Sequence, residues 1–335
     1  MKVTWSGSII SAKQTVWRQL RALRHYPPGP AAKGDRKKVF GSALEQSQQL
    51  FEAAEGVDNA SRPLLLFYGL SQAGRAIAAA SAKTSNNDFR LVGHGIEVPN
   101  LGQRPPVGNL IVINKRKGSF TQLARMLRSG TLPKGASLSQ LWASVPTLCD
   151  TPLDYCGIEH RPALQLRVNE ASSGMLLGWV YGLPQRFATG ASEQEIADFF
   201  EPYPTLAGHG SLYTHDDPLL ETDATGCISV HRVWERAAGE DRREFRLRVT
   251  QPYLSDNDRW VYPALGGGTT TLHPLLAWWA VLFTLSVLAR YEPASWTENL
   301  DVDSNANTVP LEMALDQALD ICPTLVLRAI HTVST

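Results

Sequence analysis

A histidine and two arginines form the strongest candidate for a chemical site in this sequence. Tyr68, Gln72 and Arg75 recur at helical spacing, on the side of a predicted helix opposite its apolar stripe. Most surface helices carry Lys and Glu there, so this face is expected to be only partly wet. His94 follows the helix, and Arg290 ends a second apolar helix late in the chain. If the two helices meet, these five residues would line one pocket and bind an anion.

The same residues allow an enzymatic interpretation. A histidine can remove a proton from a hydroxyl while an arginine stabilises phosphate charge, which is the chemistry of RNA cleavage. Arg90 precedes His94 by four positions, but Gly93 and Gly95 oppose a helix that would place the two side chains together. An alternative function is therefore an enzyme that processes nucleic acid or nucleotides, with His94 as acid or base and Arg75 or Arg290 holding phosphate.

Ser71 gives a third hypothesis, that of a serine hydrolase. It lies in Gly69-Leu70-Ser71-Gln72-Ala73-Gly74, which is similar to the G-x-S-x-G nucleophile elbow except that the second glycine comes one place late. The preceding residues belong to a predicted helix, whereas an elbow follows a strand. His94 and Ser71 are thus the candidate catalytic residues, and neither has a complete catalytic set around it in the sequence.

Cysteine–histidine pairs raise the question of a metal site. Cys156/His160 and Cys227/His231 have a spacing of four, and four such ligands would suit tetrahedral zinc. Structural zinc sites usually have closer cysteine pairs, so we expect no metal and no cofactor, and zinc binding by these two pairs stays an open alternative. The run His209–Asp217 is typical of a surface turn. Gly266-Gly267-Gly268 lacks the Gly-Lys-Ser/Thr of a P-loop and predicts a flexible loop.

Helices are predicted at both ends of the chain and strands in its middle. Leu66, Leu70, Ala73, Ile77 and Ala80 form one apolar stripe. The predicted helices cover 14–25, 36–55, 61–83, 120–128, 138–142, a segment after the capping box Ser192-x-x-Glu195, 274–291, 295–300, 311–320 and a last stretch past Pro323 to about 331. The predicted strands cover 110–113, 163–168, 175–181, 228–234 and 245–249.

This order of elements predicts an α+β fold, because strands and helices do not alternate regularly. We expect one domain over 1–335, with helical parts at 14–83 and 274–331 packing together around a β-rich region at 105–262. Helix 61–83 is expected to pack against helix 274–291, with the sheet covering both.

Composition limits which partners and which cellular compartment can be expected for this chain. The 335 residues include 32 Lys+Arg and 32 Asp+Glu, so the net charge is zero and gives no overall attraction to nucleic acid or anionic lipid. No secretion signal is visible, and four cysteines (Cys149, Cys156, Cys227, Cys322) fit reduced thiols. The apolar run at 275–289 is too short to span a bilayer. We expect a soluble, cytoplasmic protein that does not enter a membrane.

Three stretches form a characteristic set: Leu64–Ala76 followed by His94-Gly95-Ile96, His273-Pro274-Leu275-Leu276 leading to Phe283–Trp296, and Pro323-Thr324-Leu325-Val326-Leu327. Together they resemble the YaaC-like family of bacterial proteins. The resemblance implies a bacterial α+β protein of this length but carries no activity. The leading hypothesis is therefore a ligand-binding or protein-interaction component without catalysis, whose partner is a small anionic ligand or a protein. Nucleic acid stays open as a partner.

Overall fold

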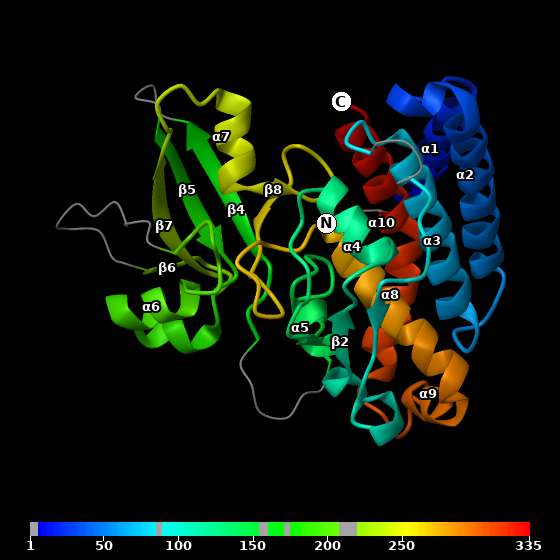
Figure 1. The fold of residues 1–335 in the computed structure, drawn as a ribbon. Coiled ribbons are helices and arrows are strands. Elements are labelled where there is room, and N and C mark those ends of the chain that lie inside the picture. The colour runs from blue at the N-terminus through cyan, green and yellow to red at the C-terminus, as the bar shows by residue number, and fades with distance from the viewer. Residues whose placement is uncertain (1–5, 85–88, 154–159, 171–174, 208–219) are drawn as a thin grey trace.

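A computed structural model describes residues 6–84, 89–153, 160–170, 175–207 and 220–335. The helical N- and C-terminal parts pack together, and a sheet-rich middle region stands beside them (Figure 1). The fold is α+β, as the order of elements predicted. The helices are α1 (Ser6–His25), α2 (Gly34–Glu55), α3 (Arg62–Ala80), α4 (Ser119–Met126), α5 (Leu138–Ala143), α6 (Glu193–Phe200), α7 (Arg242–Val249), α8 (Pro274–Tyr291), α9 (Pro293–Asn299) and α10 (Thr308–Ser334). Short 3₁₀ turns cover Gly29–Ala32, Leu101–Gln103, Val107–Asn109 and Gln185–Thr189.

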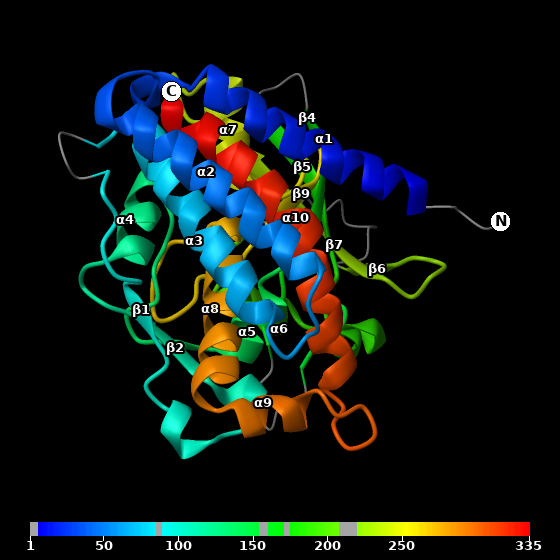
Figure 2. The same ribbon diagram turned by 90° about the vertical axis from the view of Figure 1, so that its right-hand side faces the viewer.

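Helix α3 is the centre of the helical part. It packs against α2, α8 and α10, and Figure 2 looks onto the layer in which α1, α2, α3 and α10 run together. The predicted apolar stripe of α3 is fully buried from Leu66 to Ala80. From Pro274 to Ser286 every residue of the late helix α8 is buried in this core, which explains why this part of the helix has no polar face. The expected meeting of an early and a late apolar helix is confirmed.

Helix α8 has the composition of a membrane span. Among the described residues it is the one helix long and apolar enough to cross a bilayer, and 83% of its 18 residues are buried inside the protein.

Two antiparallel sheets form from the middle of the chain. The smaller sheet has the order β1-β2-β3 and lies beside α4 and α5 (Figure 1). The larger sheet has the order β6-β7-β5-β4-β9-β8. The strands are β1 (Ile96–Glu97), β2 (Ile111–Asn114), β3 (Ala136–Ser137), β4 (Leu164–Glu170), β5 (Met175–Tyr181), β6 (Leu220–Thr222), β7 (Ile228–Glu235), β8 (Gln251–Pro252) and β9 (Arg259–Val261).

The larger sheet does not cover α3 and α8, contrary to the sequence expectation. Together with α6 and α7 it encloses a second hydrophobic core, which contains Phe199, Tyr203 and Trp234. Contact with the helical core comes from the β8–β9 end, where Tyr253 and Trp260 pack against it. Strand β5 alternates half-buried and buried residues, so one face of this sheet is covered by its own core.

The predicted strand at 245–249 is wrong, because this segment is the second half of α7. Asp241 caps the helix by accepting a hydrogen bond from the Glu244 amide at 2.8 Å. Phe245 and Val249 are four residues apart, face the core and are buried, while Leu247 is 54% exposed. The apolar alternation at 245–249 therefore arises from a helix: Phe245 and Val249 lie on its buried face, and Leu247 lies between them on the exposed side.

The two helices predicted on either side of Pro323 form one continuous helix, α10. Proline removes one backbone donor and usually kinks or ends a helix. Here Pro323 itself is buried, and its neighbours Cys322 and Val326 belong to the helical core. Tertiary burial therefore offsets the lost hydrogen bond.

Candidate functional site: a basic cluster where α3 meets α8

Helices α3 and α8 bring residues from opposite ends of the chain together. Tyr68 and Arg75 lie on α3, and Arg290 lies in the last turn of α8. Arg290 donates a hydrogen bond from Nη1 to the Tyr68 hydroxyl at 3.0 Å, across 222 positions of sequence. Its guanidinium also lies 5.1 Å from the centre of the Tyr291 ring. A cation at a helix C-terminus is favourable for the helix in itself, and here the helix end also points it at α3.

His94 is presented by a turn that requires glycine on both sides. Gly93 and Gly95 have φ values of 65° and 73°, in the left-handed region that other residues rarely adopt. A Cβ atom on Gly95 would lie 2.8 Å from the carbonyl carbon of Gly118, so the two backbones touch. The Phe120 amide donates to the His94 carbonyl at 3.0 Å, which ties the turn to the start of α4.

The His94 ring sits over the line where α3 and α8 touch. Its centre lies 5.3 Å from that of Phe67 on α3 and 5.8 Å from that of Phe283 on α8. Burial against these rings lowers the pKa of His94 below its usual 6.5, and the charges of Arg290 and Arg75 lower it further. The imidazole is therefore neutral at pH 7, beside two permanent cations.

We call Tyr68, Arg75, His94 and Arg290 the basic cluster. All four are exposed, and Gln72 is half-buried between Tyr68 and Arg75 on the same helix. The cluster lies on the surface and not in a pocket between the helices, because Phe67, Trp279 and Phe283 fill that space.

The two arginines of the cluster have no counter-charge among the residues that the structure describes. Within the described part of the chain, no carboxylate makes an ion pair with Arg75 or Arg290. The nearby Glu292 is engaged with Arg104, whose Nε lies 2.9 Å from its Oε2. The cluster can therefore attract an anion from solution.

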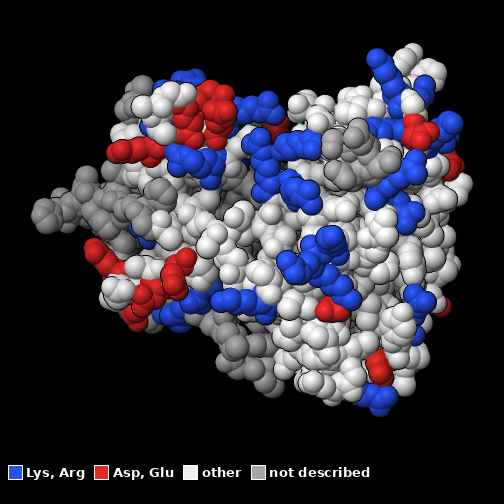
Figure 3. Space-filling view, viewed as in Figure 1, with Lys and Arg blue, Asp and Glu red and all other residues white. Residues whose placement is uncertain are grey.

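Charge is unevenly spread over the molecule. Figure 3 shows one face, on which groups of Lys and Arg side chains lie over the region of α4 and its neighbours, while most of the visible Asp and Glu lie over the sheet-rich part. The chain is neutral as a whole, so this separation gives the helical part a locally positive face.

A family model described as YaaC-like Protein matches residues 11–330. The chain belongs to the YaaC-like family. The match includes the β-rich middle, which the three stretches recognised in the sequence did not reach. Neither the curated proteins nor the solved structures contain a match.

In this YaaC-like chain, Ser71 is not on a nucleophile elbow. It lies half-buried in the middle of α3, with helix on both sides and no strand before it. The glycines around it serve helix packing: a Cβ on Gly69 would lie 2.7 Å from Phe51 on α2, and one on Gly74 would lie 2.7 Å from Trp279 on α8. The spacing that suggested an elbow is the spacing of two helix–helix contacts.

The structure describes both residues of the pair Cys227/His231 but only His160 of the pair Cys156/His160. Cys156 lies outside the described residues, as does the whole run from His209 to Asp217. His231 is on β7 and stacks on Trp179 of β5 with ring centres 4.6 Å apart. In the ranges of the YaaC-like chain that the structure describes, no three His, Cys, Asp or Glu side chains are grouped as metal ligands.

The glycine-rich loop before α8 is packed and not free. Gly266 accepts from the Lys134 amide at 2.8 Å, and a Cβ there would lie 2.7 Å from the Leu132 Cα. The loop leads to His273, whose capping role the sequence analysis did not predict. His273 caps α8 by accepting from the Leu275 amide on its Nδ1 at 3.1 Å. The signal was the position of His273 directly before Pro274, at the N-cap of a helix that begins with proline.

Sequence reasoning named every polar member of the basic cluster but not what holds it in place. Gly118 and the rings of Phe67 and Phe283 were missed. The only signal for Gly118 was its place between a strand and a helix, which does not reveal that it would meet Gly95.

Proposed function

We propose that this protein binds a small anionic ligand at the basic cluster and does not transform it. One observation carries the proposal: Arg75 and Arg290 lie near enough to His94 for their charges to lower its pKa, and neither has a carboxylate partner in the described chain. Arginine presents a planar fork that suits phosphate and carboxylate groups. The Tyr68 hydroxyl, which accepts from Arg290, fixes the direction of one fork.

Binding is favoured over catalysis because His94 lacks an orienting partner. In catalytic sites the base is usually held by a hydrogen bond to a third group. No described side chain forms a hydrogen bond with the His94 ring, which is placed by ring contacts alone. Such a ring can accept or donate one hydrogen bond to a ligand.

Titration calorimetry at low ionic strength tests the proposal, with phosphate, AMP and citrate as probes. Arg75→Gln and Arg290→Gln should each weaken binding at least tenfold, since each removes a charge-assisted contact of about 1.5–3 kcal/mol. Lys38→Gln is the matched control, because it removes an exposed charge on α2, away from the cluster. Equal affinity in all three variants and the wild type would disprove the proposal.

A second candidate is an enzyme that processes nucleic acid or nucleotides, favoured by the lowered pKa of His94. A neutral imidazole beside two arginines could take a proton from a ribose hydroxyl while the arginines hold the phosphate. Incubation with end-labelled RNA at pH 7 tests this candidate. Cleavage that His94→Gln abolishes would support it. Intact RNA in the presence of wild-type protein would eliminate it.

We further propose that the protein works in the bacterial cytoplasm. Support comes from the cysteines. Burial raises the pKa of the Cys149 thiol to about 12 and also raises the pKa of the Cys322 thiol, so both thiols are unreactive. Fractionation of cells that produce the tagged chain should place it in the soluble cytoplasmic fraction. Recovery in the membrane fraction would contradict this part of the proposal.

A further inference from the structure

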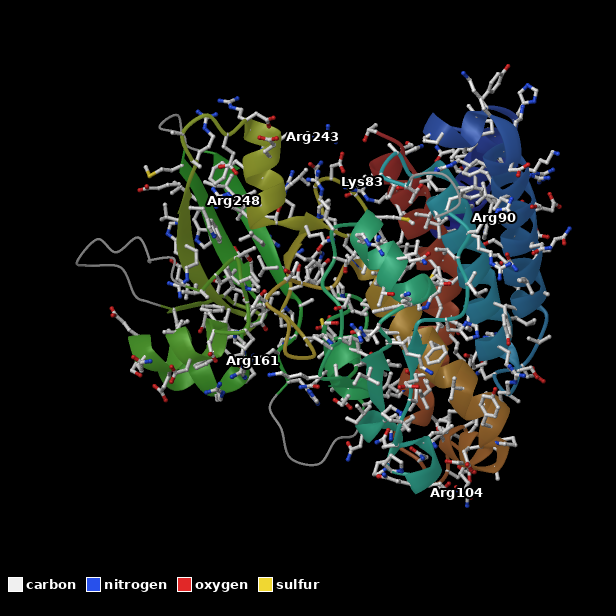
Figure 4. The ribbon with its side chains drawn as sticks, viewed as in Figure 1. Lys83, Arg90, Arg104, Arg161, Arg243 and Arg248 are labelled. Carbon is white, nitrogen blue, oxygen red and sulfur yellow. The ribbon has the colours of Figure 1, made fainter. Side chains whose placement is uncertain are left out.

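A cavity of about 290 Å³ lies beside the C-terminal ends of α3 and α4. It is lined by Lys83, Thr84, Gln122, Arg125 and Met126. Figure 4 shows Lys83 next to the end of α4. The basic cluster adjoins the other end of this helix, through the hydrogen bond from Phe120 to His94. Eight helical residues span about 12 Å, so the cavity and the basic cluster are separate sites on one helix.

The wall of the cavity that carries Lys83 is held rigidly by Arg36. This side chain donates to the carbonyls of Ser81 at 3.0 Å and of Thr84 at 2.6 Å, and to the Thr84 hydroxyl at 2.8 Å. A turn after a helix is normally the more mobile part of a fold. Here one guanidinium ties the turn to α2, so Lys83 is kept at the cavity before any ligand arrives.

Three cations meet at this place. Lys83 and Arg125 line the cavity, and the charge of Arg128, together with burial, lowers the pKa of the Lys83 ammonium. None of the three forms an ion pair with a carboxylate among the described residues. Helix dipoles account for a cation at the end of α4 but not for Lys83, which belongs to another segment.

Arg128 occupies a position where glycine is usual. Its φ is 54°, and the Ser129 amide donates to the Ala124 carbonyl at 2.8 Å, which together form a Schellman ending of α4. A non-glycine residue in this conformation costs on the order of 1 kcal/mol. The chain thus keeps an arginine beside Lys83 at the expense of stability.

Gln122 contributes a second, independent feature. Its amide oxygen is buried, with less than 1 Å² of accessible surface, and has no hydrogen-bond partner among the described residues. A buried acceptor without a donor costs about 1–3 kcal/mol. A ligand whose N–H or O–H draws the Gln122 amide toward the cavity would relieve this cost, so the cavity offers positive charge at its rim and one acceptor that a ligand can recruit.

We propose that this cavity binds a small phosphomonoester. Its phosphate would pair with Lys83 and Arg125, and a hydroxyl or amino group on its organic part would donate to Gln122. The cavity volume equals that of about ten waters at roughly 30 Å³ each, enough for a phosphoryl group and a small attached moiety but near the lower limit of ligand sites. Met126 supplies an apolar wall for that moiety.

Thermal-shift and calorimetric titrations with the full chain test the proposal. The probes are inorganic phosphate, glucose 6-phosphate and AMP, with glucose and adenosine as the uncharged counterparts. At least one phosphomonoester should bind more tightly than both inorganic phosphate and its own uncharged counterpart. Which one binds separates a sugar phosphate from a nucleotide. If no phosphomonoester binds, or if the uncharged counterpart binds equally well, the proposal is overturned.

Variants separate this cavity from the basic cluster. Lys83→Gln and Arg125→Gln change exposed side chains and should each weaken phosphomonoester binding at least tenfold, while Lys38→Gln leaves it unchanged. Gln122→Leu should weaken the binding of the organic phosphate more than that of inorganic phosphate. Binding that Arg75→Gln abolishes and Lys83→Gln does not would refute the cavity and uphold the basic cluster. The reverse pattern would refute the cluster alone.

Discussion

At the scale of single residues, the positive groups of the helical part act on one another. The His94 ring loses affinity for its proton because of burial, Arg290 and Arg75, in that order. A bound anion would cancel much of this repulsion, so protonation and anion binding are linked with positive sign. Anion affinity should therefore rise as the pH falls through the pKa of His94.

Replacement of Arg290 tests the source of this shift. Arg290→Gln should raise the pKa of His94 toward 6.5, because it removes the larger of the two charge effects and leaves burial in place. Titration of the imidazole Cε1 proton by NMR measures the shift. Lys38→Gln should leave the curve unchanged. An unchanged curve in Arg290→Gln would mean that the two groups lie too far apart to interact.

His273 makes stability depend on pH. Burial, with a smaller effect of Arg328, lowers the pKa of this partly buried cap of α8 to about 4. Between pH 6.5 and 4 the unfolded chain takes up a proton that the folded chain refuses, so stability falls as the pH falls. The loss should reach at most about 3 kcal/mol.

Urea unfolding at pH 7 and pH 4.5 measures this dependence. His273→Asn keeps a capping side chain and removes the titrating group, so its loss between the two pH values should be smaller than that of the wild type. Equal losses in both proteins would contradict the assignment.

At the scale of elements, close helix packing sets which residues α3 can contain. Gly74 and Gly69 face Trp279 and Phe51 at distances that leave no room for a methyl group. Helix α3 can therefore approach α8 closely enough for Arg290 to reach Tyr68. The basic cluster thus depends on the glycine at position 74, although Gly74 is not part of it.

A pair of glycine substitutions tests this dependence. Gly74→Ala should lower the free energy of unfolding by about 1–3 kcal/mol, because overpacking outweighs the better helix propensity of alanine. Gly41→Ala, in α2 with nothing within 4 Å of the added methyl, should raise it by about 0.5–1 kcal/mol. Chemical denaturation measures both. Stabilisation by Gly74→Ala would show that the helices are less tightly packed than described.

Sequence patterns predicted elements well where one signal was dominant. The strand 175–181 coincides with β5, and the capping box at Ser192 begins α6. They failed where two signals competed. Alternation at 245–249 concealed a helix that Asp241 starts, and Pro323 concealed the continuity of α10. Local rules cannot decide such cases, because burial against distant segments settles them.

The site divides in the same way. Residue type and helical phase led to the prediction that Tyr68, Arg75 and Arg290 would lie near one another. The prediction required only that the amphipathic helix carrying Tyr68 and Arg75 should pack against the apolar helix that ends at Arg290. The cavity at Lys83 and Arg125 was not predicted. Its residues come from a turn held by Arg36 and from the end of α4, and no spacing in the sequence connects these parts.

At the scale of the whole molecule, the chain has two hydrophobic cores, and Tyr253, directly after β8 of the larger sheet, belongs to the helical one. The Tyr253 hydroxyl accepts from Trp278 Nε1 at 2.8 Å and lies 3.1 Å from the Thr147 hydroxyl. Tyr253 directly follows β8, so it connects the end of the larger sheet to α8. The single-domain prediction requires that such contacts make the two cores unfold together.

Calorimetry of the wild type and Tyr253→Phe tests this prediction. The wild type should show one transition. The variant leaves the Trp278 donor without a partner and should lose about 1–3 kcal/mol, with its transition shifted as a whole. Two transitions in the wild type would show that the sheet-rich part is a domain of its own.

The burial of α8 has a consequence for how the chain reaches its native state. Helix α8 lies about 200 residues after α3 in the chain. During synthesis the apolar stripe of α3 is therefore made long before α8, while the intervening sheet-rich part is still being translated. Until α8 has left the ribosome, the early helices expose an apolar surface that can bind chaperones or aggregate. A nascent chain stalled before Pro274 should therefore be captured by chaperones, and one that extends past Ser334 should be released.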